Sequence, residues 1–596
     1  MKKLEAKGAV LHKKGCRFSV WAPHADEVYV IGSFNNWDKT AHSMSAGKNG
    51  VWSTDIAGVK KGDEYRYRII NGDHEYLRID PYARRVTNSV GNTIVWDPRS
   101  VAGMKPFTPP PMNEMVIYEL HIGTFGKKEG EEGPGTLEGA IRHLPYLRDL
   151  GINVIEIMPL AEFAGGYSWG YNPAHIFAVE SDYGRPRKFR EFVDEAHKLG
   201  IAVVVDVVYN HFGPSDLDLW QFDGWSENDM GGIYFYNDWR AKTPWGDTRP
   251  DYTRQEVREY IRDNAFMWLC EYNVDGLRWD MTAYIRNVYG RDHDPGSDLP
   301  EGWTLMQLVT HEIKKVRPSA INIAEDLQNN PDLTRRPKDG GAGFDTQWNA
   351  RFVHNLRKNL VATDDAHCDM HEIQDAVLHR YFLNAFERVI YTESHDEVAN
   401  GKARIPEELD PGSASSWAAR KKSTLGAALV FTTPGIPMIF QGQEFLEDDW
   451  FHDQDPLDWS KMEKYPGILQ LYKDLIALRT NAHGVTAGLT GQEVDILHLN
   501  NHVNVIAYHR WSKGGPGDST VVIANFSTHT HEQYGISFPA AGKWVVRLNS
   551  DSIFYSSDFG NSGMSEVHAK SEKEDRLPVG YIRIAPYSVL ILSQDA

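Results

Sequence analysis

Four short stretches of the sequence combine acidic side chains with histidine or arginine just after an apolar run. They are DVVYNH (206–211), GLRWD (276–280), IAED (323–326) and ESHDE (393–397). A single acidic residue after a strand is ordinarily a helix cap or a loop charge. Four such ends, two of which carry histidine and one arginine, indicate instead that these side chains meet in one site.

Carboxyl groups in such a cluster suit glycoside transfer with retention of configuration. That chemistry needs a nucleophilic carboxylate and a second carboxyl group roughly 5 Å away, which protonates the leaving oxygen and later activates the acceptor. Asp280 is the expected nucleophile, because Arg278 leaves the same side of a strand and favours the ionised carboxylate. Glu325 is the expected acid/base. Asp396, with His395, is expected to hold sugar hydroxyls and to stabilise positive charge at the anomeric carbon.

The elements that must position these residues are predicted to form a β/α barrel, in which catalytic groups lie at the carboxyl ends of the strands. Apolar runs that alternate with amphipathic helices are typical of parallel β/α units. Eight candidate strands favour a TIM-type (β/α)8 barrel over a doubly wound sheet. The strands are expected at 115–122, 153–160, 201–208, 275–279, 321–325, 343–349, 388–393 and 436–442, with helices that include 137–151, 189–200, 257–272 and 418–431.

The chain of 596 residues is too long for one compact core, and β-rich regions flank the predicted barrel. Residues 1–104 alternate short apolar runs with turn residues, which predicts an N-terminal β-sandwich. A stiff, proline-rich connector follows at 105–113. We therefore predict a multidomain α/β protein with a catalytic barrel over 105–481, interrupted by an excursion at about 210–252, and a C-terminal β domain over 482–596.

Composition limits the partners and the compartment. The formal net charge of −19 opposes binding to nucleic acid or to anionic membranes and is compatible with a neutral substrate. The three cysteines are widely separated and offer neither a disulfide framework nor zinc spacing. The N-terminal residues lack the apolar core of a signal peptide, and the longest uncharged stretch contains two prolines. We expect a cytoplasmic protein without a membrane span.

The four stretches resemble, in order, spacing and strand placement, the four motif regions of the α-amylase superfamily of glycoside hydrolases and transglycosylases. The resemblance spans the barrel and implies the same roles for Asp280, Glu325 and Asp396 that the residues themselves suggest. It also implies substrate-binding or supporting roles for a second set of residues. These are Tyr171 in the loop GYSWGYNP (166–173), Asp206, His211, Arg278 and His395.

The N-terminal region is similar to a glycogen-binding-like module. Its segments FSVWAP (18–23) and GSFNNWD (32–38) resemble the sandwich that precedes the barrel in branching enzymes, debranching enzymes and trehalohydrolases. The module therefore indicates an α-glucan enzyme without selecting one activity.

The acceptor is the open question, because water or a sugar hydroxyl could resolve the glycosyl-enzyme. The run SHDEVANGKARIPEELDPG (394–412) resembles 1,4-α-glucan branching enzymes, which transfer a cleaved α-1,4 chain to a 6-hydroxyl. Trp279 and Met281 depart from the residues usual beside the nucleophile in that group. DVVYNHFGP (206–214) is shared with maltooligosyl-trehalose trehalohydrolases. We favour branching, with a hydrolase (trehalohydrolase or amylase) as the alternative.

The resemblance implies an α-1,4-glucan partner, such as amylose, glycogen or a maltooligosaccharide, and no cofactor. Asn210 occupies the position of a calcium ligand in calcium-dependent amylases, but the excursion lacks a clustered oxygen site, so we predict no obligatory metal. The excursion also carries Trp220, Trp225, Trp239 and Trp245. We expect one or two of them to be exposed in the cleft and the others to pack against the barrel.

Overall fold

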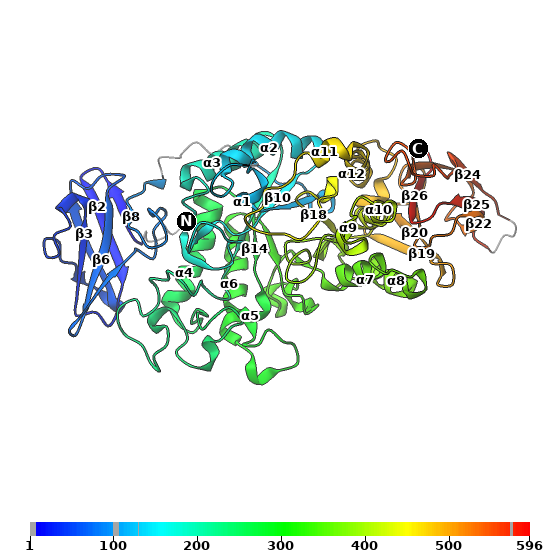
Figure 1. Ribbon diagram of the computed structural model, residues 1–596. Helices are drawn as coiled ribbons and strands as arrows, with labels where there is room; N and C mark the ends of the chain where they lie inside the picture. The colour runs from blue at the N-terminus through cyan, green and yellow to red at the C-terminus, as the bar shows by residue number, and fades with distance from the viewer. Residues whose placement is uncertain (1–6, 99–106, 129, 572–575) are drawn as a thin grey trace.

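The structure is a computed structural model that describes residues 7–98, 107–128, 130–571 and 576–596. Figure 1 shows an elongated molecule, with the N-terminal strands at one end, the barrel in the middle and the C-terminal strands at the other end. The predicted boundary between residues 104 and 105 lies outside the described residues. No helix in these ranges is both long and apolar enough to cross a membrane.

The N-terminal region forms two antiparallel sheets, as the sequence predicts. The buried residues Phe18, Val30 and Tyr67 belong to its core, and the hydroxyls of Tyr65 and Tyr67 both donate to buried Asp80. One sheet has the order β1 (Val10–His12), β2 (Gly15–Trp21), β5 (Val51–Ala57), β4 (Ser45–Ala46); the other contains β3 (Glu27–Gly32), β6 (Glu64–Asn71), β7 (His74–Arg78) and β8 (Thr93–Ile94).

Within the described chain, eight parallel strands close into a barrel, which confirms the predicted fold class. Every residue of these strands is buried and most are apolar, although buried charged residues such as Glu119, Asp206 and Arg278 lie among them. The strands are β9 (Ile117–Leu120), β10 (Val154–Ile157), β13 (Ala202–Val207), β14 (Gly276–Trp279), β15 (Ile321–Ala324), β16 (Thr346–Trp348), β17 (Arg388–Ile390) and β18 (Ile436–Phe440), and β9 pairs with both β10 and β18.

Helices connect these strands. The side chain of Thr136 caps the first turn of α2, and Gly151 ends that helix in the left-handed conformation with φ of 101°. A π-helical turn over Met267–Glu271 extends α4. The helices are α1 (Ile122–Phe125), α2 (Leu137–Leu150), α3 (Arg185–Lys198), α4 (Gln255–Phe266), α5 (Thr282–Arg286), α6 (Pro300–Val316), α7 (Ala350–Leu360), α8 (Met370–Leu378), α9 (Ile405–Leu409), α10 (Trp417–Thr432), α11 (Lys461–Lys464) and α12 (Pro466–Arg479).

Two insertions decorate the carboxyl ends of the strands. A hairpin of β11 (Ala161–Phe163) and β12 (Pro173–Val179) follows β10, and the sequence analysis did not predict it. The excursion at 210–252 has short 3-10 turns at Gly232–Tyr234 and Trp239–Ala241 as its regular structure among the described residues.

The excursion is bound firmly to the N-terminal sandwich. Arg78 at the end of β7 donates hydrogen bonds to the carbonyl oxygens of residues 220, 221 and 222, at 3.2, 2.8 and 3.0 Å. The backbone N–H of Ile79 donates to Asp218, and that of His24 to Asp223. The sandwich and the excursion therefore share partly buried polar contacts as well as packing.

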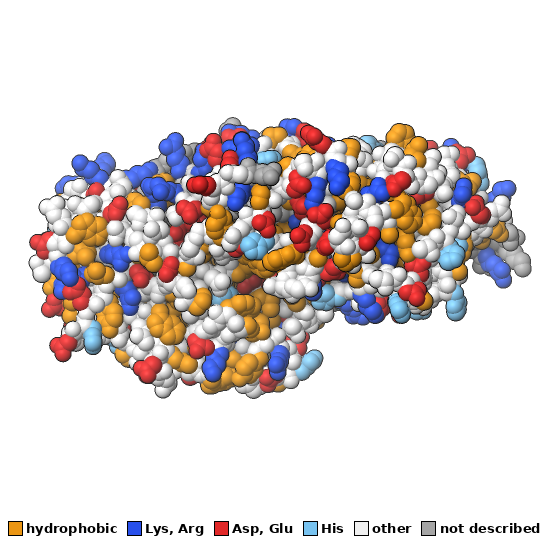
Figure 2. All heavy atoms as spheres, in the orientation of Figure 1, with side chains coloured by type: hydrophobic (Ala, Val, Ile, Leu, Met, Phe, Trp, Pro, Cys, Tyr) orange, Lys and Arg blue, Asp and Glu red, His pale blue; other side chains and the backbone are white. Residues whose placement is uncertain are grey.

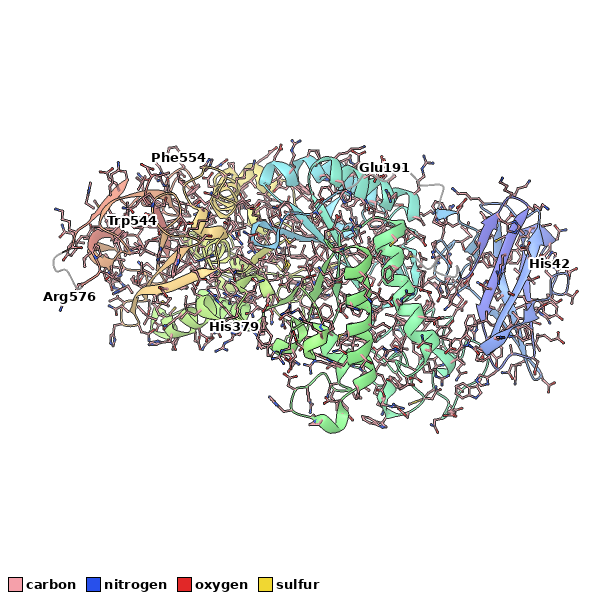
Figure 3. All side chains as sticks on the ribbon, turned by 180° about the vertical axis from the view of Figure 1, so that it is seen from behind. His42, Glu191, His379, Trp544, Phe554 and Arg576 are labelled. Carbon is pink, nitrogen blue, oxygen red and sulfur yellow. The ribbon has the colours of Figure 1, made fainter. Side chains whose placement is uncertain are left out.

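The C-terminal region is all β, as predicted, and begins after α12. Trp544, labelled in Figure 3, is fully buried in its core. A six-stranded sheet has the order β19 (Glu493–Asn500), β20 (Val505–Trp511), β21 (Thr520–Asn525), β26 (Ser588–Ser593), β23 (Gly542–Asn549), β24 (Glu566–Ala569), and β22 (His531–Ser537) pairs with β25 (Val579–Ile584).

Candidate active site

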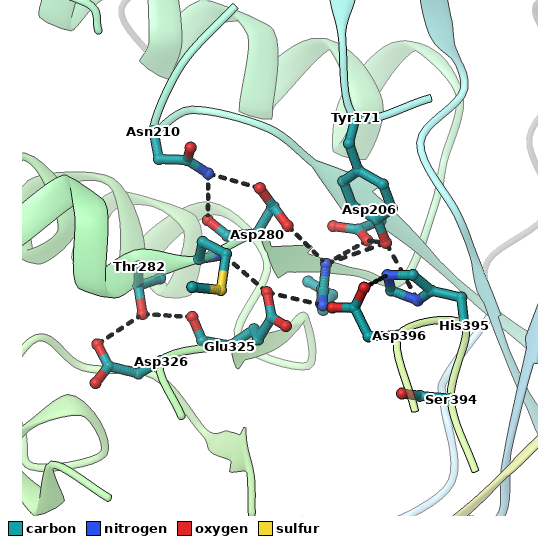
Figure 4. A network of polar contacts seen from close by, with 12 residues as sticks. Tyr171, Asp206, Asn210, Asp280, Thr282, Glu325, Asp326, Ser394, His395 and Asp396 are labelled. Atoms are coloured by element: carbon teal, nitrogen blue, oxygen red, sulfur yellow. Dashed lines mark hydrogen bonds and ion pairs between the residues drawn. The ribbon is translucent and has the colours of Figure 1, made fainter. Parts of the chain in front are cut away.

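The residues singled out in the sequence meet at the carboxyl end of the barrel, around a cavity of about 880 Å³ (Figure 4). Most of them lie at or just after the carboxyl ends of β13, β14, β15 and β17, because parallel strands bring these ends to one rim, and Tyr171 comes from the loop of the β11–β12 hairpin. Asp206 lies on β13 and pairs in register with Arg278 on β14. The residues that line the cavity include Tyr171, His211, Asp280, His395 and Asp396.

Arg278 is the centre of this arrangement. Its guanidinium is fully buried and makes ion pairs with three carboxylates: Asp206 at 2.5 Å, Asp280 at 3.3 Å and Glu325 at 3.0 Å. The central carbon of the guanidinium lies 4.2 Å from the centre of the Trp348 ring, on β16. One cation therefore positions the two carboxyl groups that retaining chemistry requires, together with a third.

Asp280 and Glu325 differ in what they bind. Asp280 accepts a hydrogen bond of 2.6 Å from Asn210 Nδ2 and contacts Arg278, whereas Glu325 Oε1 has no hydrogen-bond partner among the described residues. Burial raises the pKa of both groups, and the neighbouring Glu325 raises that of Asp280 further, against the opposing effect of Arg278. Asp280 has in addition the hydrogen bond from Asn210, which favours its ionised form.

The backbone after Asp280 is strained. Met281 adopts a left-handed conformation with φ of 37°, which is uncommon for a residue with a side chain. In this conformation its N–H donates a hydrogen bond of 2.9 Å to Glu325 Oε2. Thr282 next donates from its backbone N–H and its hydroxyl to the Glu325 carbonyl oxygen. The turn after β14 thus holds the end of β15, and so fixes the two carboxyl groups relative to each other.

His395 is held by a carboxylate that the sequence analysis missed. Glu119, in the middle of β9, is 2.5 Å from His395 Nδ1 and also accepts from the His395 backbone N–H at 3.1 Å. Burial lowers the pKa of His395, but the Asp396 and Glu119 carboxylates raise it more, to about 9. The imidazole is therefore positively charged at neutral pH. Its ring stacks on Tyr171, with centroids 4.9 Å apart.

Tyr171 and Asp206 form a second contact beside His395. The Tyr171 hydroxyl donates to Asp206 Oδ2 at 2.7 Å, while Asp206 Oδ1 is buried without a hydrogen-bond partner in the described part of the chain. Asp396 differs from the other carboxylates because 43% of its side chain is exposed. It lies on the rim of the cavity, where a substrate can reach it.

His211 also lines the cavity and is neutral. Its burial, with the charge of Arg249, lowers its pKa to about 3. Nδ1 is 2.5 Å from the side-chain oxygen of Asn210, whose amide nitrogen donates to Asp280. The amide of Asn210 is thus used to connect His211 to the candidate nucleophile.

The tryptophans of the excursion separate into three groups. Trp220 and Trp225 are partly buried and pack against the hydrophobic core, and Trp225 stacks on His24 of the sandwich at 4.5 Å. Trp245 lines the cavity and stacks on His211, with centroids 4.7 Å apart. Trp239 is 48% exposed and lies outside the lining of the cavity. One of the four tryptophans therefore faces the cleft.

A charged cluster forms the rim beyond Asp396. Glu397 is 3.1 Å from His354 Nε2 and 2.9 Å from Lys402 Nζ. Burial raises the pKa of Glu397, but the hydrogen bonds from His354 and Lys402 lower it to about 2. The three residues also line the cavity, and the sequence analysis assigned them no role.

Comparison with known families covers nearly the whole chain. The model of carbohydrate-binding module 48 (isoamylase N-terminal domain) matches residues 4–83. The alpha amylase catalytic domain matches 82–221 and 214–470, and the alpha amylase C-terminal all-beta domain matches 496–595. The catalytic match includes all the candidate site residues described above.

Relatives and solved structures agree with these matches. The chain is 30% identical to a 1,4-alpha-glucan branching enzyme GlgB of Oceanobacillus iheyensis, over 92% of the chain and 88% of that protein. It is 31% identical to one of Nocardia farcinica, over 92% and 74%. A pullulanase of Anoxybacillus sp. LM18-11, complexed with maltotetraose, shares the fold at a TM-score of 0.77 and 21% identity, over 99% of the chain and 87% of the other. The chain therefore belongs to the α-amylase family and, within it, to the family of 1,4-α-glucan branching enzymes.

Proposed function

We propose that the protein cleaves α-1,4-glucan chains with retention of configuration and transfers them to a 6-hydroxyl, making α-1,6 branches. The observation that carries the proposal is similarity along 92% of the chain to proteins named as branching enzymes. The chemistry is supported independently by two buried carboxyl groups, Asp280 and Glu325, that share one guanidinium. The match to a carbohydrate-binding module supports amylose, glycogen or a maltooligosaccharide as the partner.

In the first step, Asp280 attacks the anomeric carbon while Glu325 protonates the glycosidic oxygen. Arg278 and the Asn210 amide stabilise the ionised nucleophile, and the unpartnered Oε1 of Glu325 is free to carry the proton toward the substrate. The bond from carbon to the leaving oxygen breaks as the bond to the Asp280 oxygen forms. The product is a covalent glycosyl-enzyme and a shortened chain.

In the second step, Glu325 acts as a base. It removes the proton from the acceptor 6-hydroxyl, whose oxygen then displaces Asp280 from the anomeric carbon. This restores both carboxyl groups to their starting states. Because the same group donates and accepts the proton, its pKa must lie near the working pH, as the raised pKa of Glu325 supports.

The remaining residues are proposed to bind the sugar at the cleaved bond. Tyr171, held by stacking on His395, offers an aromatic face to the sugar ring. The charged His395 and the exposed carboxylate of Asp396 are placed to hold hydroxyls and to stabilise the transition state. Asp206 and the neutral His211 complete the wall of the site.

A hydrolase, either an amylase or a maltooligosyl-trehalose trehalohydrolase, is the second candidate. It would use the same carboxyl groups and differ in admitting water as the acceptor. Water is present at about 55 M and competes well unless the sugar acceptor is bound and oriented. Trp245 on the wall of the cleft favours transfer, because an aromatic ring in the cleft can hold a second chain.

Product analysis on amylose separates the two functions. New α-1,6 linkages, counted by proton NMR or by debranching, are compared with new reducing ends in the same digest. We expect more α-1,6 linkages than reducing ends. Reducing ends without α-1,6 linkages, or trehalose released from a maltooligosyl-trehalose, would reject branching in favour of hydrolysis.

We also propose that the protein works in the cytoplasm. All three cysteines are unpaired in the structure, and two of them, Cys16 and Cys368, are buried. Burial raises the pKa of the Cys16 thiol to about 12 and that of Cys368 to about 11. These thiols therefore stay protonated and unreactive and contribute to packing. Unpaired buried thiols are consistent with a reducing compartment.

A further inference from the structure

Two half-exposed aromatic rings lie together outside the active-site cavity. Trp239, in the excursion, and Tyr289, in the loop after α5, are each 48% exposed. Their ring centroids are 6.5 Å apart, and the ring planes are inclined by 33°. In Figure 2 apolar side chains gather on the lower lobe of the molecule, the region where Figure 1 places α5. Large aromatic side chains that are exposed next to each other often mark a binding surface.

A buried arginine fixes this pair. Arg249 is fully buried and donates hydrogen bonds to the carbonyl oxygens of Arg240, at 2.7 Å, and Lys242, at 2.6 Å, beside Trp239. It also donates to the carbonyl oxygen of Val288, next to Tyr289, at 2.7 Å. One guanidinium thus connects the two segments that carry the rings. The surface is preorganised, so a ligand would lose little free energy in ordering it.

The same arginine supports the wall of the active site. It also donates to the carbonyl oxygen of Tyr284, whose ring contacts that of Trp245 at 5.1 Å. Trp245 in turn stacks on His211 inside the cavity. The segments that carry the exposed pair and the wall of the cleft are therefore held by the same guanidinium.

Polar groups of fixed geometry surround the rings. Asp238 and Arg240 flank Trp239 and make a two-pronged ion pair, with contacts of 2.7 and 3.0 Å. Arg291 lies 5.9 Å from the centre of the Tyr289 ring. Sugars bind where the apolar faces of their rings meet aromatic side chains and their hydroxyls meet oriented charged or amide groups. A protein partner would instead need a much larger apolar surface.

We propose that Trp239 and Tyr289 form a second glucan-binding platform, which holds a length of α-1,4-glucan that extends beyond the active-site cavity. The inclined rings suit a chain that curves, as α-1,4-linked chains do. The inference rests on the proposed α-glucan substrate. Chains long enough to reach both the cavity and the platform should bind more tightly than chains that fit in the cavity alone. The platform thereby selects donor or acceptor chains by length.

The test measures binding without turnover. In an Asp280→Asn background, Trp239→Ala and Tyr289→Ala are made singly and together, and affinity is measured by electrophoresis through gels that contain amylopectin. We expect each change to weaken binding roughly three- to tenfold. Binding of a maltooligosaccharide short enough to fit the cavity, measured by titration calorimetry, should not change.

Matched variants separate the loss of stacking from damage to the fold. Trp239→Phe keeps an aromatic face and should retain most of the affinity for amylopectin, whereas Trp239→Ala should not. Phe554→Ala removes a ring that is 86% exposed in the C-terminal region, far from the excursion, and should leave binding unchanged (Figure 3). Thermal unfolding temperatures check that each variant is folded.

The outcomes are distinguishable. If the Asp280→Asn parent fails to bind amylopectin, the proposed function is wrong. If the parent binds it and the double variant binds equally well, the platform is wrong while the function stands. An equal loss for the short maltooligosaccharide, or a change in oligomeric state on sedimentation in place of a change in glucan affinity, would also overturn the platform.

Discussion

Replacing Arg278 by glutamine should move the pH dependence of glucan cleavage to higher pH. Its guanidinium lies 3.3 Å from Asp280 and 3.0 Å from Glu325. One ion pair at 3.3 Å is worth about 5 kcal/mol at an effective dielectric constant of about 20. Three carboxylates share this cation, so each is stabilised by only a part of that energy. We expect Arg278 to lower the pKa of each carboxyl group by roughly 1–3 units.

Both limbs of the profile should shift, for different reasons. The acid limb follows ionisation of Asp280, and the alkaline limb follows loss of the Glu325 proton. Without Arg278 the pKa of each group rises, so each limb should move up by about 1–3 units while the maximal rate falls. The assay is kcat/KM for amylose cleavage from pH 4 to about 10.

A graded control separates charge from hydrogen bonding. Asn210→Ala removes a neutral hydrogen bond of 2.6 Å to Asp280 and leaves Arg278 in place. It should raise the acid limb by less than about one unit and leave the alkaline limb alone. If Arg278→Gln folds, binds glucan and keeps both limbs where the wild-type enzyme has them, the assignment of Arg278 as the group that tunes this pair is wrong.

Three further predictions concern the same site. Asp280→Asn should lower turnover by several orders of magnitude while glucan affinity persists, measured by initial rates and affinity electrophoresis; wild-type turnover would contradict the nucleophile assignment. Trp245→Ala should raise the ratio of hydrolysis to transfer about threefold or more, counted as reducing ends against α-1,6 linkages, and an unchanged ratio would contradict a role in acceptor binding. Glu397 has a pKa of about 2 against an ordinary 4.5, because the hydrogen bonds from His354 and Lys402 outweigh the effect of burial. Its carboxylate therefore stabilises the fold above pH 4.5 and loses that contribution as pH falls toward 2. Glu397→Gln should therefore lower the unfolding temperature at pH 6, by an effect worth about 3 kcal/mol, and much less near pH 2; an equal loss at both would refute this.

The barrel, and the meeting of the candidate carboxyl groups at its rim, could be predicted because both follow from local sequence patterns. The barrel strands are buried and mostly apolar, so each appears as an apolar run, and the residues of interest lie at or just after its end. Asp280 and Glu325 directly follow β14 and β15, and Asp206 is the last residue but one of β13. The weakest predicted strand, at 343–349, is also one of the shortest in the barrel, Thr346–Trp348.

Other parts of the site are not indicated by any local sequence pattern. Glu119 lies within β9 and meets His395 across 276 residues of sequence, so only the closure of the barrel brings them together. The structural role of Arg249 is not indicated by the sequence either. Its hydrogen-bond acceptors are backbone carbonyl oxygens, which every residue has. The tryptophans of the excursion could not be sorted into cleft and core, since that depends on the sandwich packed against it.

The contacts of Arg78 with residues 220–222 bear on how such an enzyme can be rebuilt. One guanidinium from the sandwich satisfies three consecutive carbonyl oxygens of the excursion, and the same excursion carries Trp245 to the cleft. Deleting the first hundred residues would remove the hydrogen bonds that Arg78 donates to these carbonyl oxygens. The excursion, and with it the wall of the cleft at Trp245, would then be held less rigidly. The sandwich and the excursion should therefore be exchanged as one unit. A sandwich taken from a relative should preserve the wall of the cleft only when the excursion of that relative is introduced with it.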